Sequence, residues 1–333
     1  MNAAPSPRLS IVVPVHNDRA LLRRCLEALI RAMAVAKVST ELIVVDDGST
    51  EDIAPVVPAQ VHVVRLEDNR GPATARNAGA RVARGRVLLF VDADVAVAPD
   101  AVARVVDHFR PRRRRAAVIG SYDDRPEGGI VSRYRNLLHH HTHQQAPTEI
   151  SHFWTGLGAV RRRLFWALGG FDEGRRALED VEFGYRLSSC GYAIALDKHL
   201  QGTHLKRWTL ASMVRTDVFT RALPWAALLL REKTLPDDLS FSWNHRGSAM
   251  TAGLSVACGW GGLLWWPLGL VAVAAAGGFV ALNQSLFALL WRRGGPWFAL
   301  SCLPLHLFYY SYTGLALAFG VMRYGLLGRV LGP

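Results

Sequence analysis

The sequence predicts an α/β protein with a mostly parallel sheet flanked by helices, followed by a group of apolar C-terminal helices. Three observations carry this prediction. Short β-branched runs alternate with helical patterns in the first 230 residues, acidic residues follow the ends of several predicted strands, and charged residues are missing from two long stretches near the C-terminus. The chain has 333 residues, enough for about two domains of ordinary size.

The predicted strands are short apolar runs that end in polar residues. They are LSIVVPV (9–15), ELIVVDD (41–47), VHVVRL (61–66) and GRVLLFVDAD (85–94). Helical periodicity marks the segments between them, including RALLRRCLEALIRAMAVA (19–36) and GPATARNAGARVAR (71–84). Strands that alternate with helices predict a mostly parallel sheet with helices on both faces.

The C-terminal third has the composition of membrane-spanning helices. Residues 247–291 and 294–322 contain no Asp, Glu, Lys or Arg, and about 20 apolar residues suffice to span a bilayer as a helix. A buried helical bundle is the alternative. Two to three transmembrane helices are expected, at about 249–266, 267–291 and 296–321, within a membrane domain 248–322 that follows a linker 231–247 and precedes a tail 323–333.

The flanking sequence predicts where the protein lies. MNAAPSPR leads directly into the first strand without a signal peptide, so we expect a multi-pass cell-membrane protein whose large N-terminal domain is cytoplasmic. A helix at about 208–232 has an apolar body with basic ends and is predicted to lie on the membrane surface; packing within the soluble domain is the alternative.

The formal net charge is +12, partly from RPRRRR (110–115). This basic run is either a solvated loop or a contact for anionic membrane lipids. No nucleic acid partner is expected.

Acidic residues follow the predicted strands at the edge where ligands bind in parallel sheets. Asp46 and Asp47 end the second strand, and Asp92 and Asp94 end the fourth. No GxGxxG follows the first strand and no GxxxxGK[ST] occurs, so neither a dinucleotide fold nor a P-loop is supported. Adjacent carboxylates repel unless a cation joins them, and Mg²⁺ or Mn²⁺ with substrate phosphates suits this pattern. We expect Asp94 on the turn against the metal.

Six motifs follow one another over residues 9–187, namely IVVPVHN, VVDDGST, NRGPATARNAGA, LLFVDADV, GGFDE and LEDVEFGYRL. The ordered set resembles the family 2 glycosyltransferases, which have the GT-A fold, and the resemblance covers residues 1–230. It implies a metal-dependent transfer, with inversion, from a nucleotide diphosphate sugar to a lipid or glycan acceptor of the cell envelope. A UDP-sugar is the favoured donor.

The resemblance also implies roles for individual residues. The predicted nucleotide site is Pro14, His16, Asn17, Asp46, Asp47, Arg76 and Asp92, with Asp46 toward the nucleobase and Asp47 toward the ribose. The predicted metal ligands are Asp92, Asp94 and His204. Asp180, beside Glu179, is the predicted catalytic base. The predicted acceptor side comprises Trp154, Gly169, Gly170, Arg207 and Trp208.

Several of these residues also have a purely structural interpretation. Glu179 and Asp180 would suit a helix N-terminus, the glycines of GGFDE would suit a helix C-cap, and Trp154 would suit a core. Gln201 does not have the spacing to Arg207 that processive synthases carry in Q-x-x-R-W, which argues against processive polymerisation.

Two other functions fit the sequence less well than sugar transfer. A nucleotidyltransferase would need a basic triphosphate loop after the first strand, whereas PVHNDRA has one arginine and no glycine. A non-catalytic membrane scaffold would need neither the metal pair nor the acidic base.

Overall fold

The computed structural model describes residues 6–110, 115–232, 239 and 243–330. The chain divides into two compact units, Met1–Pro126 with Ala146–Lys206 and Glu127–Gln145 with Arg207–Pro333. The sequence predicted a single boundary near residue 230. Instead, a helical insertion from the middle of the catalytic part packs with the C-terminal helices. Most of the basic run at 110–115 and of the predicted linker at 231–247 lies outside the described residues.

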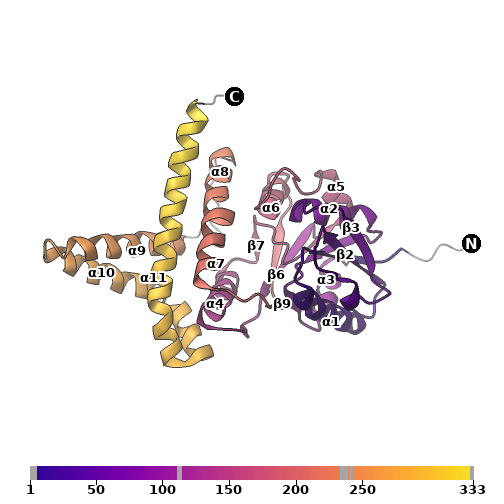
Figure 1. The fold of residues 1–333 in the computed structure, drawn as a ribbon, viewed down its shortest axis with the longest axis horizontal. Coiled ribbons are helices and arrows are strands. Elements are labelled where there is room, and N and C mark those ends of the chain that lie inside the picture. The colour runs from indigo at the N-terminus through magenta and orange to yellow at the C-terminus, as the bar shows by residue number, and fades with distance from the viewer. Residues whose placement is uncertain (1–5, 111–114, 233–238, 240–242, 331–333) are drawn as a thin grey trace, which may run out of the picture. The chain divides into compact units, whose positions relative to one another are not determined.

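The first unit is built on one sheet, which has nine strands among the described residues (Figure 1). The order is β3-β2-β1-β4-β8-β6-β9-β5, with β7 beside β9. The strands are β1 (Leu9–Val15), β2 (Thr40–Asp47), β3 (His62–Leu66), β4 (Val87–Val91), β5 (Val95–Val97), β6 (Ala117–Tyr122), β7 (Glu149–Ile150), β8 (Leu157–Arg161) and β9 (Ile194–His204).

The sheet is mixed, where the sequence predicted a mostly parallel one. β3, β2, β1 and β4 are parallel, as predicted, and β9 is parallel to β6. β8 lies antiparallel between β4 and β6, while β5 and β7 pair antiparallel with β9. β5 follows β4 after three residues but does not pair with it, and instead lies at the far edge of the sheet beside β9.

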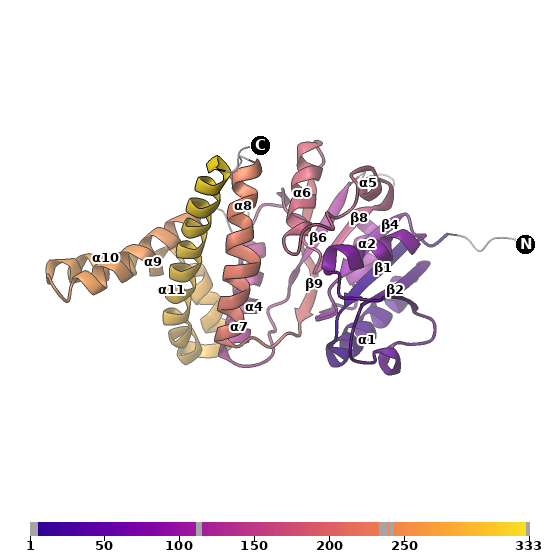
Figure 2. The ribbon, with the colours of Figure 1, turned by 45° about the horizontal axis from the view of Figure 1, so that its top comes forward.

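Helices cover both faces of this sheet, because alternate residues of each buried strand point to opposite sides. Ile11 and Val13 of β1 pack into a core with α1 (Arg19–Ala36) and α3 (Ala101–His108). Val12 points to the other face, where α2 (Pro72–Val82) lies (Figure 2). A Cβ at Gly79 of α2 would stand 2.5 Å from the Val12 side chain, so the glycine permits this close helix–strand packing. The remaining helical segments of the unit are η1 (Ala54–Val56), α5 (Arg162–Ala167) and α6 (Glu179–Ser189).

The second unit is helical. Its segments are α4 (Ile130–Gln145), α7 (Leu210–Arg215), the π-helical η2 (Thr216–Ala222), α8 (Leu223–Glu232), α9 (Trp243–Gly261), α10 (Pro267–Leu282) and α11 (Gln284–Val330). The helix predicted at about 208–232 is therefore present as α7, η2 and α8 in succession. α9 and α10 form an antiparallel pair (Figure 1), and α11 is broken at Gly295, which has φ of 81°.

Buried polar contacts tie α4 into this unit. The Tyr134 hydroxyl meets Nδ1 of His306 at 2.7 Å, and Nε2 of the same ring meets Oδ1 of Asn283 at 3.0 Å. The Arg135 guanidinium forms a buried ion pair with Asp217 of η2. Trp208, predicted on the acceptor side, is buried in the same helical core and its backbone N–H donates to the Ser132 hydroxyl at 2.7 Å. Buried polar groups need such partners, so α4 belongs structurally with the C-terminal helices.

The predicted membrane spans correspond only in part to the observed helices. Among the described residues, no single helix has both the length and the apolar composition for crossing a bilayer. Pro267–Leu282 and Gln284–Gly325 meet that requirement only together, as a pair bent by 68°. The bend falls at Asn283, which is buried and donates to the Ser248 hydroxyl.

Candidate active site

Polar side chains from the carboxyl ends of β1, β2 and β4 surround one pocket of about 400 Å³. The pairing of Val15 with Asp46, and of β1 with β4, places these strand ends at the same edge. The lining residues are Pro14, Val15, His16, Asn17, Asp18, Asp47, Asn69, Gly71, Pro72, Ala75, Arg76, Asp92, Ala93, Asp94 and Lys206. Six of the seven predicted nucleotide-site residues are therefore gathered around one cavity, together with Asp94 of the predicted metal site.

Asp47 organises the loop that forms one side of this pocket. Its two carboxylate oxygens accept hydrogen bonds from the backbone N–H groups of Arg70 and Gly71, at 2.8 and 2.9 Å. His16 donates from Nδ1 to the Asp47 carbonyl at 2.8 Å. The loop between β3 and α2 is thereby fixed against the end of β2.

Asp46 is the predicted nucleotide-site residue that does not line the pocket. Its carboxylate accepts from the Ser49 N–H at 2.9 Å and lies 3.3 Å from the Arg65 guanidinium. Neighbouring residues of a strand point to opposite faces, so Asp46 and Asp47 cannot both face this cavity from β2. The role of Asp46 toward a nucleobase stays a prediction.

Arg76 links two parts of the site that are far apart in the sequence. Nη1 donates to Glu179 at 2.5 Å and Nη2 donates to Asp92 at 2.6 Å, and the residue is 5% exposed. Burial raises the pKa of Asp92, against the opposing charge of Arg76. Burial and the nearby charge of Asp180 raise the pKa of Glu179 to about 7. One cation thus serves the buried carboxyl group of Glu179 and the partly buried one of Asp92, which favours keeping a proton on one of them.

Asp94 faces a different set of partners. β5 pairs with β9 so that Val95 lies opposite His204, and this brings Nε2 of His204 within 3.3 Å of the Asp94 carboxylate. Burial alone would raise the pKa of Asp94, but His204 and the charge of Lys206 outweigh it and leave the pKa below its usual value. Asp94 is therefore the more readily ionised member of the Asp92–Asp94 pair.

The three predicted metal ligands are not gathered into one set in the described part of this structure, and their shared role stays a prediction. Among the described residues, no group of three or more His, Cys, Asp or Glu side chains has an arrangement that could hold a metal ion. The physical reason is that Asp92 is turned to Arg76. Asp94 and His204 remain together, and a carboxylate and an imidazole beside a pocket with room for phosphates fit a divalent cation that completes its coordination with substrate oxygens and water.

Asp180 is held at the start of α6. Its Oδ2 accepts from both the N–H and the hydroxyl of Thr155, at 3.2 and 3.1 Å, and Oδ1 accepts from the Val181 N–H at 2.8 Å. Asp180 does not itself line the pocket, but its neighbour Glu179 is joined through Arg76 to Asp92, and both Arg76 and Asp92 line it. The predicted base therefore stands close to the acidic cavity, with its carboxylate orientation fixed.

Comparison with known proteins supports the interpretation of this edge. The family model described as glycosyl transferase family 2 matches residues 10–169. Residues 10–169 belong to glycosyl transferase family 2. This domain includes the whole of the pocket lining except Lys206.

Individual proteins also match this chain over part of its length. Validoxylamine A glucosyltransferase of Streptomyces hygroscopicus subsp. jinggangensis is 30% identical over 59% of this chain and 55% of its own length. Minor teichoic acid biosynthesis protein GgaA of Bacillus subtilis is 28% identical over 52% of this chain and 42% of its own. The chain spans about half the length of these curated relatives. A solved mannosyltransferase from Pyrobaculum calidifontis, in complex with GDP-Man and Mn²⁺, has a TM-score of 0.57 at 18% identity, covering 96% of this chain and 90% of that one; this likeness supports the GT-A-like fold.

The glycines of GGFDE terminate a helix in the family 2 domain. Gly169 and Gly170 have φ of 84° and 72°, and Gly170 N–H donates to the Phe165 carbonyl at 2.9 Å. This is the C-cap interpretation. Asn77 of α2 holds the next residue by donating to the carbonyl of Phe171 and accepting from its N–H, at 2.8 and 3.0 Å. The glycines do not line the acidic pocket, and contact with an acceptor stays a prediction.

Trp154 and His204 are joined through an aromatic residue that the sequence did not single out. Tyr122 stacks on the His204 ring at 4.4 Å between centroids and meets the edge of Trp154 at 4.9 Å. Trp154 also packs against the main core. The stacking fixes the imidazole plane, so Tyr122 positions His204 toward Asp94.

Thr155 and Lys206 were also missed. Thr155 follows Trp154 in the motif WTGLG, but nothing in that motif reveals that it bonds a residue 25 positions away. Lys206 follows His204 by two residues, and alternation along an extended segment was the signal that could have placed both on one side. Arg207, predicted on the acceptor side, belongs to the second unit.

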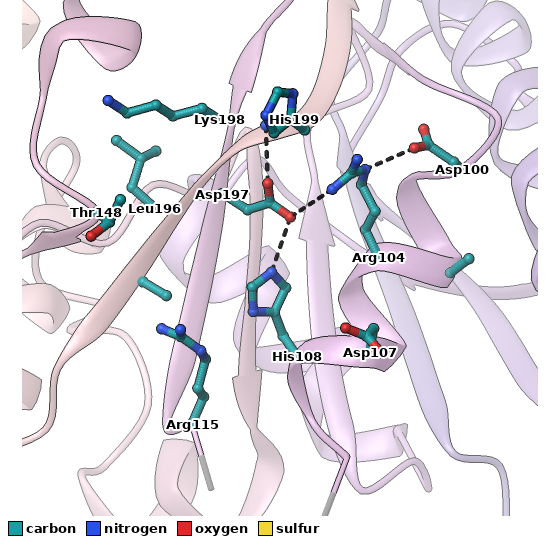
Figure 3. A pocket seen from close by; sticks show the side chains of 12 residues that line it. Asp100, Arg104, Asp107, His108, Arg115, Thr148, Leu196, Asp197, Lys198 and His199 are labelled. Atoms are coloured by element: carbon teal, nitrogen blue, oxygen red, sulfur yellow. Dashed lines mark hydrogen bonds and ion pairs between the residues drawn. The ribbon is translucent and has the colours of Figure 1, made fainter. Parts of the chain in front are cut away.

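Another pocket of the first unit, of about 620 Å³, lies beside α3 and the first half of β9 and shares no residue with the acidic pocket (Figure 3). Its central carboxylate, Asp197, is bound by Arg104 at 3.2 Å, His108 at 3.0 Å and the His199 N–H at 3.0 Å. Burial opposes ionisation of Asp197, but these three partners hold its pKa well below the usual range. A carboxylate so fully satisfied is a structural anchor between α3 and β9.

Proposed function

We propose that the chain is an inverting glycosyltransferase that moves a sugar from a nucleotide diphosphate sugar to a hydroxyl of a membrane-associated lipid or glycan. The observation that carries the proposal is the acidic pocket. Asp47, Asp94 and Lys206 line one cavity, which lies in the family 2 domain except for Lys206. Asp180, oriented by Thr155, follows Glu179, which Arg76 joins to that cavity's Asp92.

The proposed base is Asp180. Two donors from Thr155 hold one carboxylate oxygen and the Val181 N–H holds the other, so the carboxylate does not need to reorient when an acceptor hydroxyl approaches. Removal of the hydroxyl proton as the oxygen attacks the sugar C1 contributes about 10²- to 10⁴-fold in rate. One base opposite one leaving group gives a single displacement, and the anomeric configuration inverts.

The leaving group is a nucleoside diphosphate, whose negative charge grows as the bond to C1 breaks. Lys206 supplies a fixed positive charge at the pocket, and such preorganised charge stabilises a developing anion. Asp94 and His204 are the residues that would hold a divalent cation. When bound, Mg²⁺ or Mn²⁺ supplies Lewis-acid stabilisation of the diphosphate. Metal use is supported by the Mn²⁺ in the similarly folded Pyrobaculum mannosyltransferase.

We further propose that the second unit attaches the enzyme to the cell membrane with the family 2 domain on the cytoplasmic side. Large apolar side chains are exposed at the end of α9 and in the turn to α10. The exposed fractions of Trp260, Leu264 and Trp266 are 72%, 93% and 73%. Tryptophan is typical of the membrane–water interface, and exposed apolar surface of this kind marks an interaction site.

The decisive experiment is a donor screen with the purified full-length chain. UDP-, GDP- and dTDP-sugars would be incubated with Mn²⁺, and release of nucleoside diphosphate would be measured with and without lipid extract. Asp94→Ala and Asp180→Asn are expected to abolish transfer, while Asp180→Asn still binds the nucleoside diphosphate. Asp107→Asn is the matched control, because Asp107 pairs with Arg110 outside the acidic pocket. Full turnover by Asp180→Asn would remove that residue from the role of base.

Membrane attachment has its own measurement. Flotation of the full chain with liposomes is expected to carry it to the top of a gradient, and a chain that stays at the bottom with every lipid composition would contradict the membrane proposal without touching the catalytic one.

A further inference from the structure

An apolar groove lies where α10 ends and α11 breaks. It has a volume of about 560 Å³ and lies wholly within the second unit. Its lining residues are Val280, Phe287, Ala288, Trp291, Arg292, Pro296, Ala299, Leu300 and Leu303. Gly295, with φ of 81°, allows the sharp break, since only glycine adopts this conformation readily. α11 changes direction at this break, and residues from both sides of the break line the groove.

Several side chains of the groove are exposed in the described parts of the protein. Trp291 and Leu300 are each 59% exposed, and Ala288 is exposed between them. A volume of this size is ordinary for a pocket that takes a small molecule, and its apolar lining suits hydrocarbon.

Charge is distributed one-sidedly around this groove. Arg292 is its only charged lining residue, and it is exposed and forms no ion pair with another described residue. From residue 239 to the C-terminus the sequence contains five arginines and no Asp, Glu or Lys. An occupant therefore meets uncompensated positive charge at one point and hydrocarbon elsewhere.

We propose that this groove binds one anionic phospholipid, with an acyl chain against Trp291, Ala288 and Leu300 and the phosphate at the Arg292 guanidinium. An arginine can donate two hydrogen bonds to a phosphate, whereas a neutral apolar ligand would leave that charge unused. The inference rests on the proposed membrane attachment but not on sugar transfer, and it adds a defined lipid site to a general apolar surface.

The test is a binding titration of the purified full chain, in neutral detergent and without donor sugar. Fluorescently labelled phosphatidylglycerol and phosphatidylcholine are the two probes. Phosphatidylglycerol is expected to bind about tenfold more tightly, because the choline ammonium of phosphatidylcholine offsets the attraction of its phosphate to Arg292. Arg292→Ala should remove this preference, and Ala288→Trp, which fills the groove, should weaken both lipids.

Two matched variants separate the groove from general attraction. Arg323→Ala removes the same charge from an exposed site on α11, and Ala257→Trp adds the same bulk on an exposed site of α9. Both should bind like the wild type. Equal losses in Arg292→Ala and Arg323→Ala, equal affinities for the two lipids, or unchanged binding by a folded Ala288→Trp would each overturn the proposal. Activity of Asp180→Asn bears only on sugar transfer, so the two proposals fail independently.

Discussion

Removing the Arg76 guanidinium should destabilise the family 2 domain and inactivate it at once. Arg76 is 5% exposed and donates to Glu179 at 2.5 Å and to Asp92 at 2.6 Å. Arg76→Met fills similar space but leaves the buried Glu179 and the partly buried Asp92 without their cation. Taking one partner from a buried ion pair costs about 3–5 kcal/mol.

The expected loss is large enough to measure directly. For a folding unit of about 150–250 residues, 1 kcal/mol lowers Tm by about 2–4 °C, so Arg76→Met should melt about 6–20 °C below the wild type. Thermal unfolding of the full chain, followed by calorimetry, gives Tm, and guanidinium unfolding gives the free energy.

The matched rescue is the triple variant Arg76→Met with Asp92→Asn and Glu179→Gln, which removes both stranded charges. It should recover at least half of the lost stability yet stay inactive, because the charge pattern beside the acidic pocket is gone. A Tm for Arg76→Met within 2 °C of the wild type, or a triple variant no more stable than Arg76→Met, would refute the reasoning.

Three further predictions address the base, the buried acid and the metal. Thr155→Val removes the hydroxyl that lies 3.1 Å from Asp180 and should lower kcat roughly tenfold with little change in the donor KM; steady-state kinetics in which only KM changes would contradict the orienting role. Glu179 has a folded pKa raised to about 7, so the native state holds a proton that the unfolded state releases, and stability should fall as pH rises from about 4.5 to 7. Unfolding of Glu179→Gln across this range should show a flatter profile, and parallel profiles would rule Glu179 out as the source. His204→Ala should raise the Mn²⁺ concentration for half-maximal activity by roughly tenfold or more, and EDTA should stop wild-type transfer; an unchanged Mn²⁺ titration would exclude His204 as a ligand.

The acidic edge of the sheet shows how much of the site could be predicted from the sequence. Strands 9–15, 41–47 and 85–94 were predictable because their apolar, β-branched residues stand out, and parallel pairing then forces Asp47 and Asp94 to the same edge. The family motifs added the resemblance to family 2 glycosyltransferases over residues 1–230, and the family model matches residues 10–169 of that stretch. None of this required knowledge of a side-chain conformation.

The pairing of side chains across the site was not predictable in the same way. Asp92 was expected at the metal but is bound by Arg76, since α2 packs its arginine between the end of β4 and the start of α6. The antiparallel course of β5 decides that His204 meets Asp94. A stretch of sequence does not show which distant element will lie against it.

By itself, the sequence determined the resemblance to family 2 glycosyltransferases, the strands of the first half and the apolar character of the C-terminal third, because these depend on local motifs, periodicity and composition. Only the tertiary structure decided that α4 packs with the C-terminal helices, that Arg76 bridges Asp92 and Glu179, and that Thr155 orients Asp180. Each of these is a contact between segments far apart in the chain, and it is fixed by packing and buried hydrogen bonds that exist only once the helices and strands have come together.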